Sequence, residues 1–262
     1  MTPSLTLDRH AHLGREAAAS ATRGASAAFV REKCATCSVA ALCLPGGLSH
    51  DDLRPLQSLF LTTRRISEGE AVYGDGDPFR FIYAVRRGTC KTTLAGRDGR
   101  EQVTGFHMAG EVMGLEGVAH GVHATSAVAL EDTEVCLIPY QRLVAVTAAT
   151  PGAKDLLTHL MSQEIVRDHS LMLMLGFNEA PNRLAAFLLN LSERYAARGY
   201  SPREFHLRMS RGEIASFIGV KVETISRTLS LFQRSGFIQA RGRHVRITDL
   251  EGLKQQYELR IR

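Results

Sequence analysis

Short strand-like pieces alternate with turns between Arg64 and Pro139, and this pattern restricts the fold of the chain more than any other feature. The pieces are rich in β-branched and aromatic residues, and turns containing glycine or proline separate them. They span residues 81–85, 89–94, 102–106, 125–130 and 134–138. Many short strands at regular turn spacing predict a β sandwich, jelly roll or barrel.

A long helix is predicted to follow, with Thr150 as its N-cap and Pro151 at its first position, and to run to about Leu175. Its residues at steps of three and four form a seam that consists of Met161, Ile165, Asp168, Met172 and Leu175. This spacing is typical of a coiled coil, so two copies of the chain are predicted to pair along it. A helix that packs only on its own domain would explain the apolar positions, but less easily the aspartate among them.

The chain after the long helix has the layout of a winged helix-turn-helix. Ser210 and Glu213 have the spacing of a capping box, in which each side chain satisfies a free backbone N–H group of the other residue. Gly219 permits a tight turn after the helix that they start. The predicted helices and strands of this part span residues 179–198, 210–218, 222–234, 237–240 and 244–247.

The outer face of the helix over 222–234 carries the residues that we expect to contact DNA, namely Glu223, Thr224, Ser226 and Arg227. Arginine can bind guanine through two hydrogen bonds, and glutamate can accept one from cytosine. Lys221 and Arg243 are expected to neutralise phosphates. From Gly176 onward 15 Lys and Arg oppose 8 Asp and Glu, a net charge of +7, and because the whole chain carries +5 the preceding part carries −2. This imbalance favours a polyanionic partner for the C-terminal part.

Five cysteines, with no apolar signal segment before them, indicate metal or redox chemistry rather than a disulfide framework. Cys34, Cys37 and Cys43 lie on one short segment, and Cys136 lies in a predicted strand. Four thiolates suit either an iron–sulfur cluster or a zinc ion, and their spacing alone does not choose between the two. Cys90 is expected to be an inert, buried core residue.

Four stretches resemble the fumarate-and-nitrate-reduction regulators, a group within the cyclic-AMP-receptor superfamily. They are Gly105–His107, Leu184–Phe187, Ser201–Phe205 and Val222–Arg227. The resemblance covers roughly residues 34–250, and the Glu-x-x-Ser-Arg pattern of the last stretch is specific. It implies that Glu223, Ser226 and Arg227 read a palindrome of the TTGAT-N4-ATCAA type. Lys221 departs from the family pattern, because members usually have a small hydroxyl residue there as the helix N-cap.

The same resemblance implies the cofactor. The oxygen sensors of the family carry a similar set of cysteines, and Val135–Pro139 is similar to the context of their last one. A [4Fe-4S] cluster is therefore expected on Cys34, Cys37, Cys43 and Cys136, with Ser38 and Leu42 shielding it from oxygen. Cyclic AMP, the superfamily's other common ligand, is not expected, since Thr125 stands where the nucleotide binders carry an arginine for the phosphate.

Asp168 suggests how oxygen would control DNA binding. In a parallel pair of helices it would meet its own copy, and two carboxylates in an apolar seam repel each other. We expect the intact cluster to favour the dimer against this penalty, and its loss in oxygen to return the protein to monomers. The resemblance also implies that the dimer contacts RNA polymerase, through the loop Ala95–Glu101 and the surface near Arg87 and Asp132.

The expected fold class is α+β, in four parts. A disordered N-terminal segment (1–29) precedes a cluster-binding segment and a β jelly roll of the cyclic-nucleotide-binding kind, which together form the sensor domain (30–149). A dimerisation helix (150–176) leads to a winged helix-turn-helix domain (177–262). No apolar run approaches the ~18–20 residues that cross a bilayer, so we expect a cytoplasmic protein.

Two alternatives remain at this point. One is a regulator of the same fold that a small molecule controls, with zinc or nothing on the cysteines. The other is an iron–sulfur enzyme, but the chain has no P-loop, no Gly-x-Gly-x-x-Gly motif and no His-Glu-x-x-His motif, so we expect no enzymatic activity.

Overall fold

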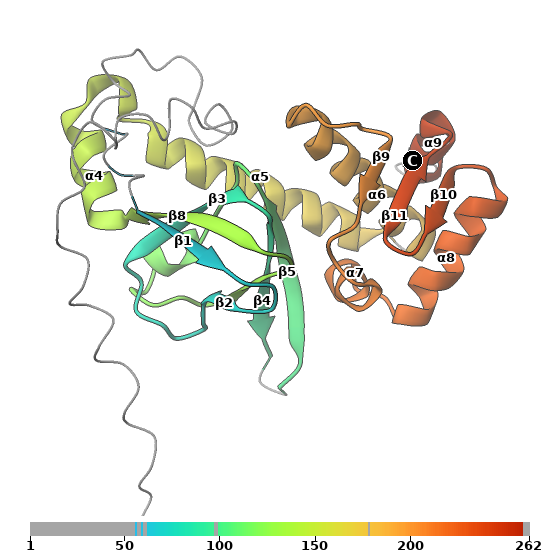
Figure 1. Ribbon diagram of the computed structural model, residues 1–262, viewed down its shortest axis with the longest axis horizontal. Coiled ribbons are helices and arrows are strands. Elements are labelled where there is room, and N and C mark those ends of the chain that lie inside the picture. Colours follow the sequence, from blue (N-terminus) through green and yellow to red (C-terminus); the bar gives the residue numbers. More distant parts are fainter. Residues whose placement is uncertain (1–55, 57–58, 60–61, 97–98, 178, 259–262) are drawn as a thin grey trace, which may run out of the picture.

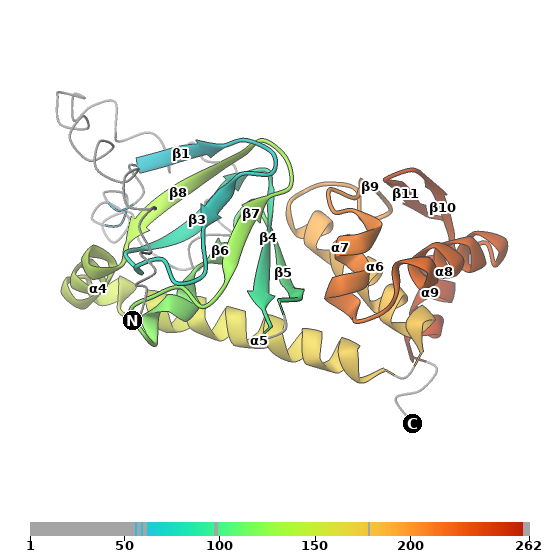
Figure 2. The ribbon, with the colours of Figure 1, turned by 90° about the horizontal axis from the view of Figure 1, so that it is seen from below.

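The computed structural model describes residues 56, 59, 62–96, 99–177 and 179–258 of the 262-residue chain. Figures 1 and 2 show two lobes joined by one long helix, with the β-rich lobe formed by the earlier part of the chain and the helical lobe by the later part. The strands of the first lobe are β1 (Thr62–Ile66), β2 (Ala71–Tyr73), β3 (Phe81–Arg87), β4 (Thr89–Ala95), β5 (Glu101–Met108), β6 (Val112–Met113), β7 (Ser126–Ala129) and β8 (Thr133–Pro139).

The β-rich lobe is a sandwich of two four-stranded antiparallel sheets, in the orders β1-β8-β3-β6 and β2-β7-β4-β5. Alternating burial along β7, where Ala127 and Ala129 are buried and Ser126 and Val128 are half-buried, is the pattern of a strand with one face toward a core. The five predicted strands are confirmed as β3, β4, β5, β7 and β8, with β7 one residue shorter at each end than predicted. The prediction lacks β1, which is mostly polar, and the very short β2 and β6, because such strands carry too little alternation to be recognised.

The long helix begins later than the sequence predicts. α4 (Tyr140–Ala149) ends at Thr150, which has extended dihedral angles (φ −115°, ψ 103°), and Pro151 then opens a 3₁₀ turn, η2 (Pro151–Ala153). The long helix α5 spans Leu156–Gly176, with Asp155 as its N-cap. The expected start at Thr150–Pro151 is therefore wrong. Proline fits the first position of a 3₁₀ turn as well as that of an α-helix, because both leave the first N–H group unpaired.

The helical lobe has the predicted order of helices and strands. Its elements are α6 (Ala180–Ala197), β9 (Glu204–His206), α7 (Arg211–Ile218), α8 (Val222–Arg234), β10 (Ile238–Arg241), β11 (His244–Ile247) and α9 (Leu250–Glu258). The three strands form one sheet in the order β10-β11-β9. The three helices and the wing hairpin are thus confirmed, whereas β9 and α9 have no counterpart in the prediction.

One cluster of buried side chains continues from one lobe into the other. Val103, Phe106 and Met108 of β5 belong to the same cluster as Phe187 of α6 and Phe232 of α8. In Figure 2 the β4–β5 hairpin reaches toward α7 and α6, while α5 runs along both lobes. The helix-turn-helix is therefore packed against the sandwich rather than hanging from α5 alone.

Candidate nucleic-acid interface and cluster site

A capping box fixes the start of the helix-turn-helix. Ser210 Oγ accepts a hydrogen bond from the backbone N–H of Glu213 at 3.2 Å, and Glu213 Oε2 accepts one from the backbone N–H of Ser210 at 2.7 Å. Gly219 ends α7 with a φ of 66°, a left-handed conformation that glycine adopts without steric strain. α8 then begins at Val222. The local signals noted in the sequence are therefore the ones that set the angle between α7 and α8.

α8 has a buried inner face and an accessible outer face. Its buried side chains are those of Ile225, Thr228, Leu229 and Phe232. On the outer face Glu223 and Arg227 are exposed, and Thr224 and Ser226 are half-buried. Charged and hydroxyl groups in the first turns of such a helix can reach base edges in the major groove of DNA. The structure thus brings the four predicted base-contacting residues together on one helix.

Two basic residues lie close to these side chains. Lys221 is the N-cap of α8, and its exposed side chain makes no capping hydrogen bond. Arg211, at the first position of α7, donates a hydrogen bond from Nη1 to Ser226 Oγ at 2.9 Å. Sequence reasoning missed Arg211, because 15 residues separate it from Ser226. The helix-turn-helix layout, which packs α7 against α8, is the signal that could have found it.

The wing carries the remaining predicted phosphate contact. β10 and β11 pair up to Arg241 and His244, so Gly242 and Arg243 form the tip of the hairpin. Arg241, Arg243 and Arg246 are all exposed, and Arg243 donates a long hydrogen bond of 3.4 Å to the backbone oxygen of Arg208. The wing packs beside α8 (Figure 1), so its cations and Lys221 can meet the backbone of one DNA duplex.

α5 carries an exposed apolar stripe. Ile165 and Met172 are 52% and 66% exposed, Met161 and Leu175 are also exposed, and Asp168 lies exposed among them. The buried residues of the helix lie on another face and are Leu156, Leu160 and Met174. All five predicted seam residues are therefore accessible in a single copy of the chain, and Asp168 also lines a pocket between β5, α5 and α6. Val166 and Leu173 are exposed as well, but each lies ~100° around the helix from the neighbouring seam residue and lines the pocket between β5, α5 and α6.

Cys136 is the only predicted cluster ligand within the described residues; Cys34, Cys37 and Cys43 lie outside them, as do Ser38 and Leu42. Its half-buried side chain lies on β8, where it pairs with Thr63 of β1 and Ala84 of β3. Cys136 packs against a buried cluster that contains Leu56 and Leu59. Thus Leu56 and Leu59, which follow the three N-terminal cysteines in the sequence, lie in the cluster against which the fourth cysteine packs. Within the described residues no three His, Cys, Asp or Glu side chains lie close enough together to hold a metal ion.

Cys90 has the buried position that the sequence predicts. Its side chain is fully buried in β4, and burial raises the pKa of its thiol to about 12. The thiol is therefore protonated at neutral pH and is a poor metal ligand, because metals bind the thiolate.

The interior of the sandwich contains a polar cluster at the stretch that resembles a cyclic-nucleotide site. Glu116 Oε1 accepts a hydrogen bond from Thr125 Oγ1 at 2.9 Å and lies 3.2 Å from His123 Nδ1. The ring of Tyr73 stacks on the ring of His123 with 4.0 Å between the centroids. Burial is the main reason why the pKa of Tyr73 lies above its ordinary range. Glu116, Thr125 and the two rings thus contact one another, whereas the buried Nε2 atom of His123 has no hydrogen-bond partner among the described residues.

The described helices include none that is both long and apolar enough to cross a membrane.

Comparison with known proteins gives matches over both lobes. One family model, a Crp-like helix-turn-helix domain, matches residues 182–256, and another, a cyclic nucleotide-binding domain, matches residues 63–150. The chain is 44% identical over 222 residues to the transcriptional regulatory protein btr of Bordetella pertussis, and the aligned region covers 85% of this chain and 92% of that protein.

Two further matches agree with these. The chain is 40% identical over 222 residues to the fumarate and nitrate reduction regulatory protein of Escherichia coli K12, which covers 85% of this chain and 89% of that protein. The solved structure of FixK2 from Bradyrhizobium japonicum matches with a TM-score of 0.68 at 28% identity, over 74% of this chain and 96% of that one.

Proposed function

The chain belongs to the Crp/Fnr family of DNA-binding transcription regulators, and from that premise we propose that it senses oxygen through a [4Fe-4S] cluster and binds DNA as a dimer while the cluster is intact. It is a regulator and not an enzyme. The observation that carries the oxygen-sensing part is the position of Cys136 on β8, packed against the cluster of Leu56 and Leu59, which follow the N-terminal cysteines in the sequence.

DNA readout is assigned to the outer face of α8. Glu223, Ser226 and Arg227, with Thr224 beside them, contact the base edges of each half of a TTGAT-N4-ATCAA type palindrome. Their shared position in the first turns of α8, where Glu223 and Arg227 are exposed and Thr224 and Ser226 half-buried, supports this assignment. Lys221 and Arg243 contact phosphates, and their side chains are exposed on the same lobe.

Dimerisation is assigned to the exposed stripe of α5. Two copies bury Met161, Ile165, Met172 and Leu175 against each other, and Asp168 of one protomer faces its copy. The two-fold axis of such a pair matches the symmetry of a palindromic operator. A monomer would hold only one half-site and would therefore bind weakly.

The cluster ligands are Cys34, Cys37, Cys43 and Cys136. Cys43 precedes the buried Leu56 by 13 residues, and a chain of that length spans at most ~45 Å, so the N-terminal thiols can reach β8. When bound, a [4Fe-4S] cluster supplies an inorganic core that oxygen degrades. Cys136 ties the N-terminal segment to the sheet that leads into α4, and Ser38 and Leu42 restrict the access of oxygen to that segment.

The principal competing function is control by a cyclic nucleotide, because residues 63–150 match the family model of a cyclic nucleotide-binding domain. A cyclic phosphate needs a cation, and Thr125 offers only a hydroxyl group at that position. Glu116 already accepts a hydrogen bond from Thr125, and His123 lies within reach of the same oxygen. We therefore leave cyclic AMP out of the proposal. Contact with RNA polymerase is assigned to the loop Ala95–Glu101 and to the exposed Arg87 and Asp132.

Anaerobic purification followed by exposure to air tests the proposal. The wild-type protein should contain about four iron and four sulfide ions per chain, absorb in the visible range, and lose this absorbance and its operator affinity together in air. Cys136→Ala should lose both under anaerobic conditions. Cys90→Ala, which removes another cysteine of the sandwich, is the matched control and should keep both. Undiminished anaerobic pairing and operator affinity in Cys136→Ala would overturn the proposal.

A further inference from the structure

The junction between the two lobes is organised around a single carboxylate, that of Glu111. Glu111 follows β5 in the sandwich, and its side chain is only 12% exposed. Arg194 of α6 donates hydrogen bonds to both of its oxygens, at 3.0 Å from Nε and 2.6 Å from Nη2. Arg198, one turn further along α6, donates one from Nη2 at 2.5 Å. A carboxylate held by two arginines in this way has a defined position and orientation.

Both arginines are also hydrogen-bonded to the backbone of the sandwich. Arg194 Nη2 donates to the carbonyl oxygen of Phe106, and Arg198 Nε donates to that of Ala109 at 2.7 Å. Glu111 Oε2 in turn accepts a hydrogen bond from the backbone N–H of Met108 at 3.0 Å. Burial alone would raise the pKa of Glu111, but the positive charges of the arginines outweigh it and hold the pKa at about 2. The carboxylate is therefore ionised at neutral pH, with its charge compensated.

The dimerisation helix joins the same group. Arg167 of α5 lies 4.0 Å from Glu111 Oε2 and 3.2 Å from Glu164 Oε2. The carboxylate of Glu111, in the β-rich lobe, thus attracts cations from both α5 and α6. These are the last two helices before the helix-turn-helix.

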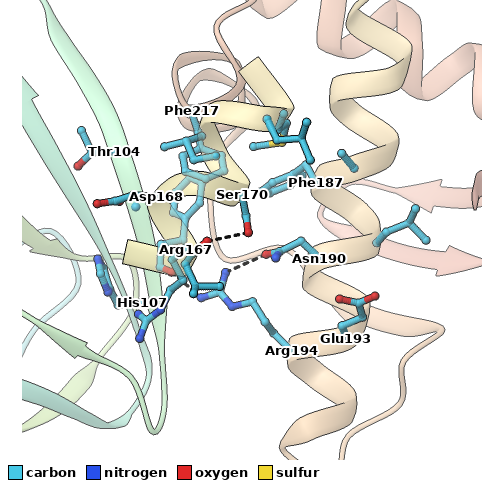
Figure 3. A pocket seen from close by; sticks show the side chains of 18 of the residues that line it. Thr104, His107, Arg167, Asp168, Ser170, Phe187, Asn190, Glu193, Arg194 and Phe217 are labelled. Carbon is cyan, nitrogen blue, oxygen red and sulfur yellow. Dashed lines mark hydrogen bonds between the residues drawn. The ribbon is translucent and has the colours of Figure 1, made fainter. Parts of the chain in front are cut away.

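Packing alone fills the junction incompletely. A cavity of about 590 Å³ lies between β5, α5 and α6, and Figure 3 shows Asp168, Arg167 and Arg194 among the side chains around it. Beside the cavity the two lobes share the hydrophobic cluster described above, in which the rings of Phe106 and Phe217 lie 5.0 Å apart between centroids. Because the cavity leaves part of the junction unfilled, the ion pairs at its edge add to this packing in setting the angle between the lobes.

A second set of contacts connects the sandwich to α7. Lys91 of β4 donates a hydrogen bond from Nζ to Glu213 Oε1 at 2.7 Å, on the capping-box residue itself. The backbone N–H of Val103 donates to Ser216 Oγ at 2.9 Å, and Gln102 donates to the backbone oxygen of Ser216. These side chains are more accessible than Glu111, so they are weaker restraints. They extend the restraint at α6 to the first helix of the helix-turn-helix.

We propose that Glu111 is a positioning residue for DNA recognition. It fixes the angle of α6 relative to α5, and thereby the separation and rotation of the two α8 helices in a dimer. This inference rests on the proposed function, since it needs two copies paired along α5. On this inference Glu111, which does not touch DNA, determines which spacing between operator half-sites the dimer prefers.

The test compares operators whose half-sites are moved apart or together by one or two base pairs. One base pair changes the distance between half-sites by ~3.4 Å and rotates one against the other by ~35°. The variant is Glu111→Gln, which keeps the shape of the side chain and removes its charge. Glu134→Gln is the matched control, because it breaks a 3.0 Å pair with Arg86 that lies entirely within the sandwich. Sedimentation and visible absorbance are measured on the same anaerobic samples.

We expect Glu111→Gln to remain a cluster-containing dimer. Its affinity for the best operator should fall about tenfold, and its preference for that operator over those with altered spacing should fall about tenfold as well. A loss of folded protein would lower affinity for all operators equally, so the spacing preference separates positioning from stability. Arg194→Gln, which leaves Glu111 paired with Arg198, should have a smaller effect in the same direction.

Three outcomes would overturn this inference. The first is an unchanged spacing preference in a Glu111→Gln dimer, and the second is loss of pairing in that variant while the cluster is present. The third is an equal change of spacing preference in Glu134→Gln. A wild type that does not pair would overturn the proposed function and this inference with it, and sedimentation reveals it before DNA is added.

Discussion

Replacing Asp168 with alanine should convert the chain into a dimer that needs no cluster. Asp168 is the one charged residue among the five seam positions of α5, and it is exposed in a single copy. In a parallel pair the two Asp168 carboxylates face each other in an apolar seam, where their repulsion is poorly screened. Alanine removes the repulsion and is also the best helix former.

The expected magnitude follows from the exposure of the seam. Met161, Ile165, Met172 and Leu175 are between 36% and 66% exposed. Burying one such side chain completely is worth ~1.5–3 kcal/mol, so eight half-exposed side chains in a pair contribute ~6–12 kcal/mol. Association itself costs ~4–15 kcal/mol, and the two terms nearly cancel. At a separation of ~6 Å and an effective dielectric constant of ~20, two carboxylates repel by ~3 kcal/mol, which is roughly 100-fold in the dimerisation constant.

Analytical ultracentrifugation in air measures this directly, with operator binding followed by fluorescence anisotropy on the same samples. Wild-type protein should be mostly monomeric, and Asp168→Ala should be dimeric and bind the operator without iron. Asp155→Ala is the control, since it removes the same charge from the start of α5, outside the seam. If Asp168→Ala stays monomeric in air, or if Asp155→Ala dimerises equally well, the proposed balance at the seam is wrong.

Two further predictions concern the DNA-binding lobe and the junction. Lys221→Ser should supply the missing N-cap of α8 and raise the free energy of unfolding of the protein in urea by ~1 kcal/mol. It should also weaken operator binding and reduce the slope of log affinity against log salt concentration by about one ion. An unchanged slope would show that Lys221 contacts no phosphate. Glu111 has a pKa of about 2 in the folded protein against 4.5 ordinarily, so its stabilisation is complete above pH ~4.5 and disappears as the pH falls toward 2. Wild-type protein should therefore lose up to ~3 kcal/mol more than Glu111→Gln over that range. Burial lowers the pKa of His107 to about 4 in the wild type, and loss of the Glu111 charge lowers it further in the variant, so His107 contributes to both curves. Parallel curves for the two proteins would contradict this account.

The recognition elements could be predicted from the sequence because local interactions determine them. The capping box of Ser210 and Glu213 spans four residues, and Gly219 follows within the same short stretch. The seam of α5 was predicted from spacing alone, because the period of a helix repeats within each turn or two. The start of α5 could not be predicted in this way, since Thr150–Pro151 is an equally good signal for the 3₁₀ turn that the structure contains.

The junction between the lobes could not be predicted for a related reason. Glu111 and Arg194 are 83 residues apart, and Lys91 and Glu213 are 122 residues apart. Neither pair belongs to a periodic pattern, and arginines on the surface of a helix are common in any basic domain. Only the packing of β5 against α6 brings these charges together. The residues that we propose to contact bases lie in a local sequence pattern, whereas the residue that we infer to orient them lies in none.

The polar cluster of Glu116, His123, Thr125 and Tyr73 has a consequence for how this sandwich can be used. In a receptor whose interior binds its signal, the folded state is completed by the incoming molecule, and occupancy changes its shape or rigidity. Here Glu116, Thr125 and the rings of Tyr73 and His123 already contact one another, so a molecule that entered this part of the sandwich would have to displace those contacts. Under the proposed function the signal would act instead at the edge of the sandwich where Cys136 packs against Leu56 and Leu59, and β8 would pass the change directly into α4.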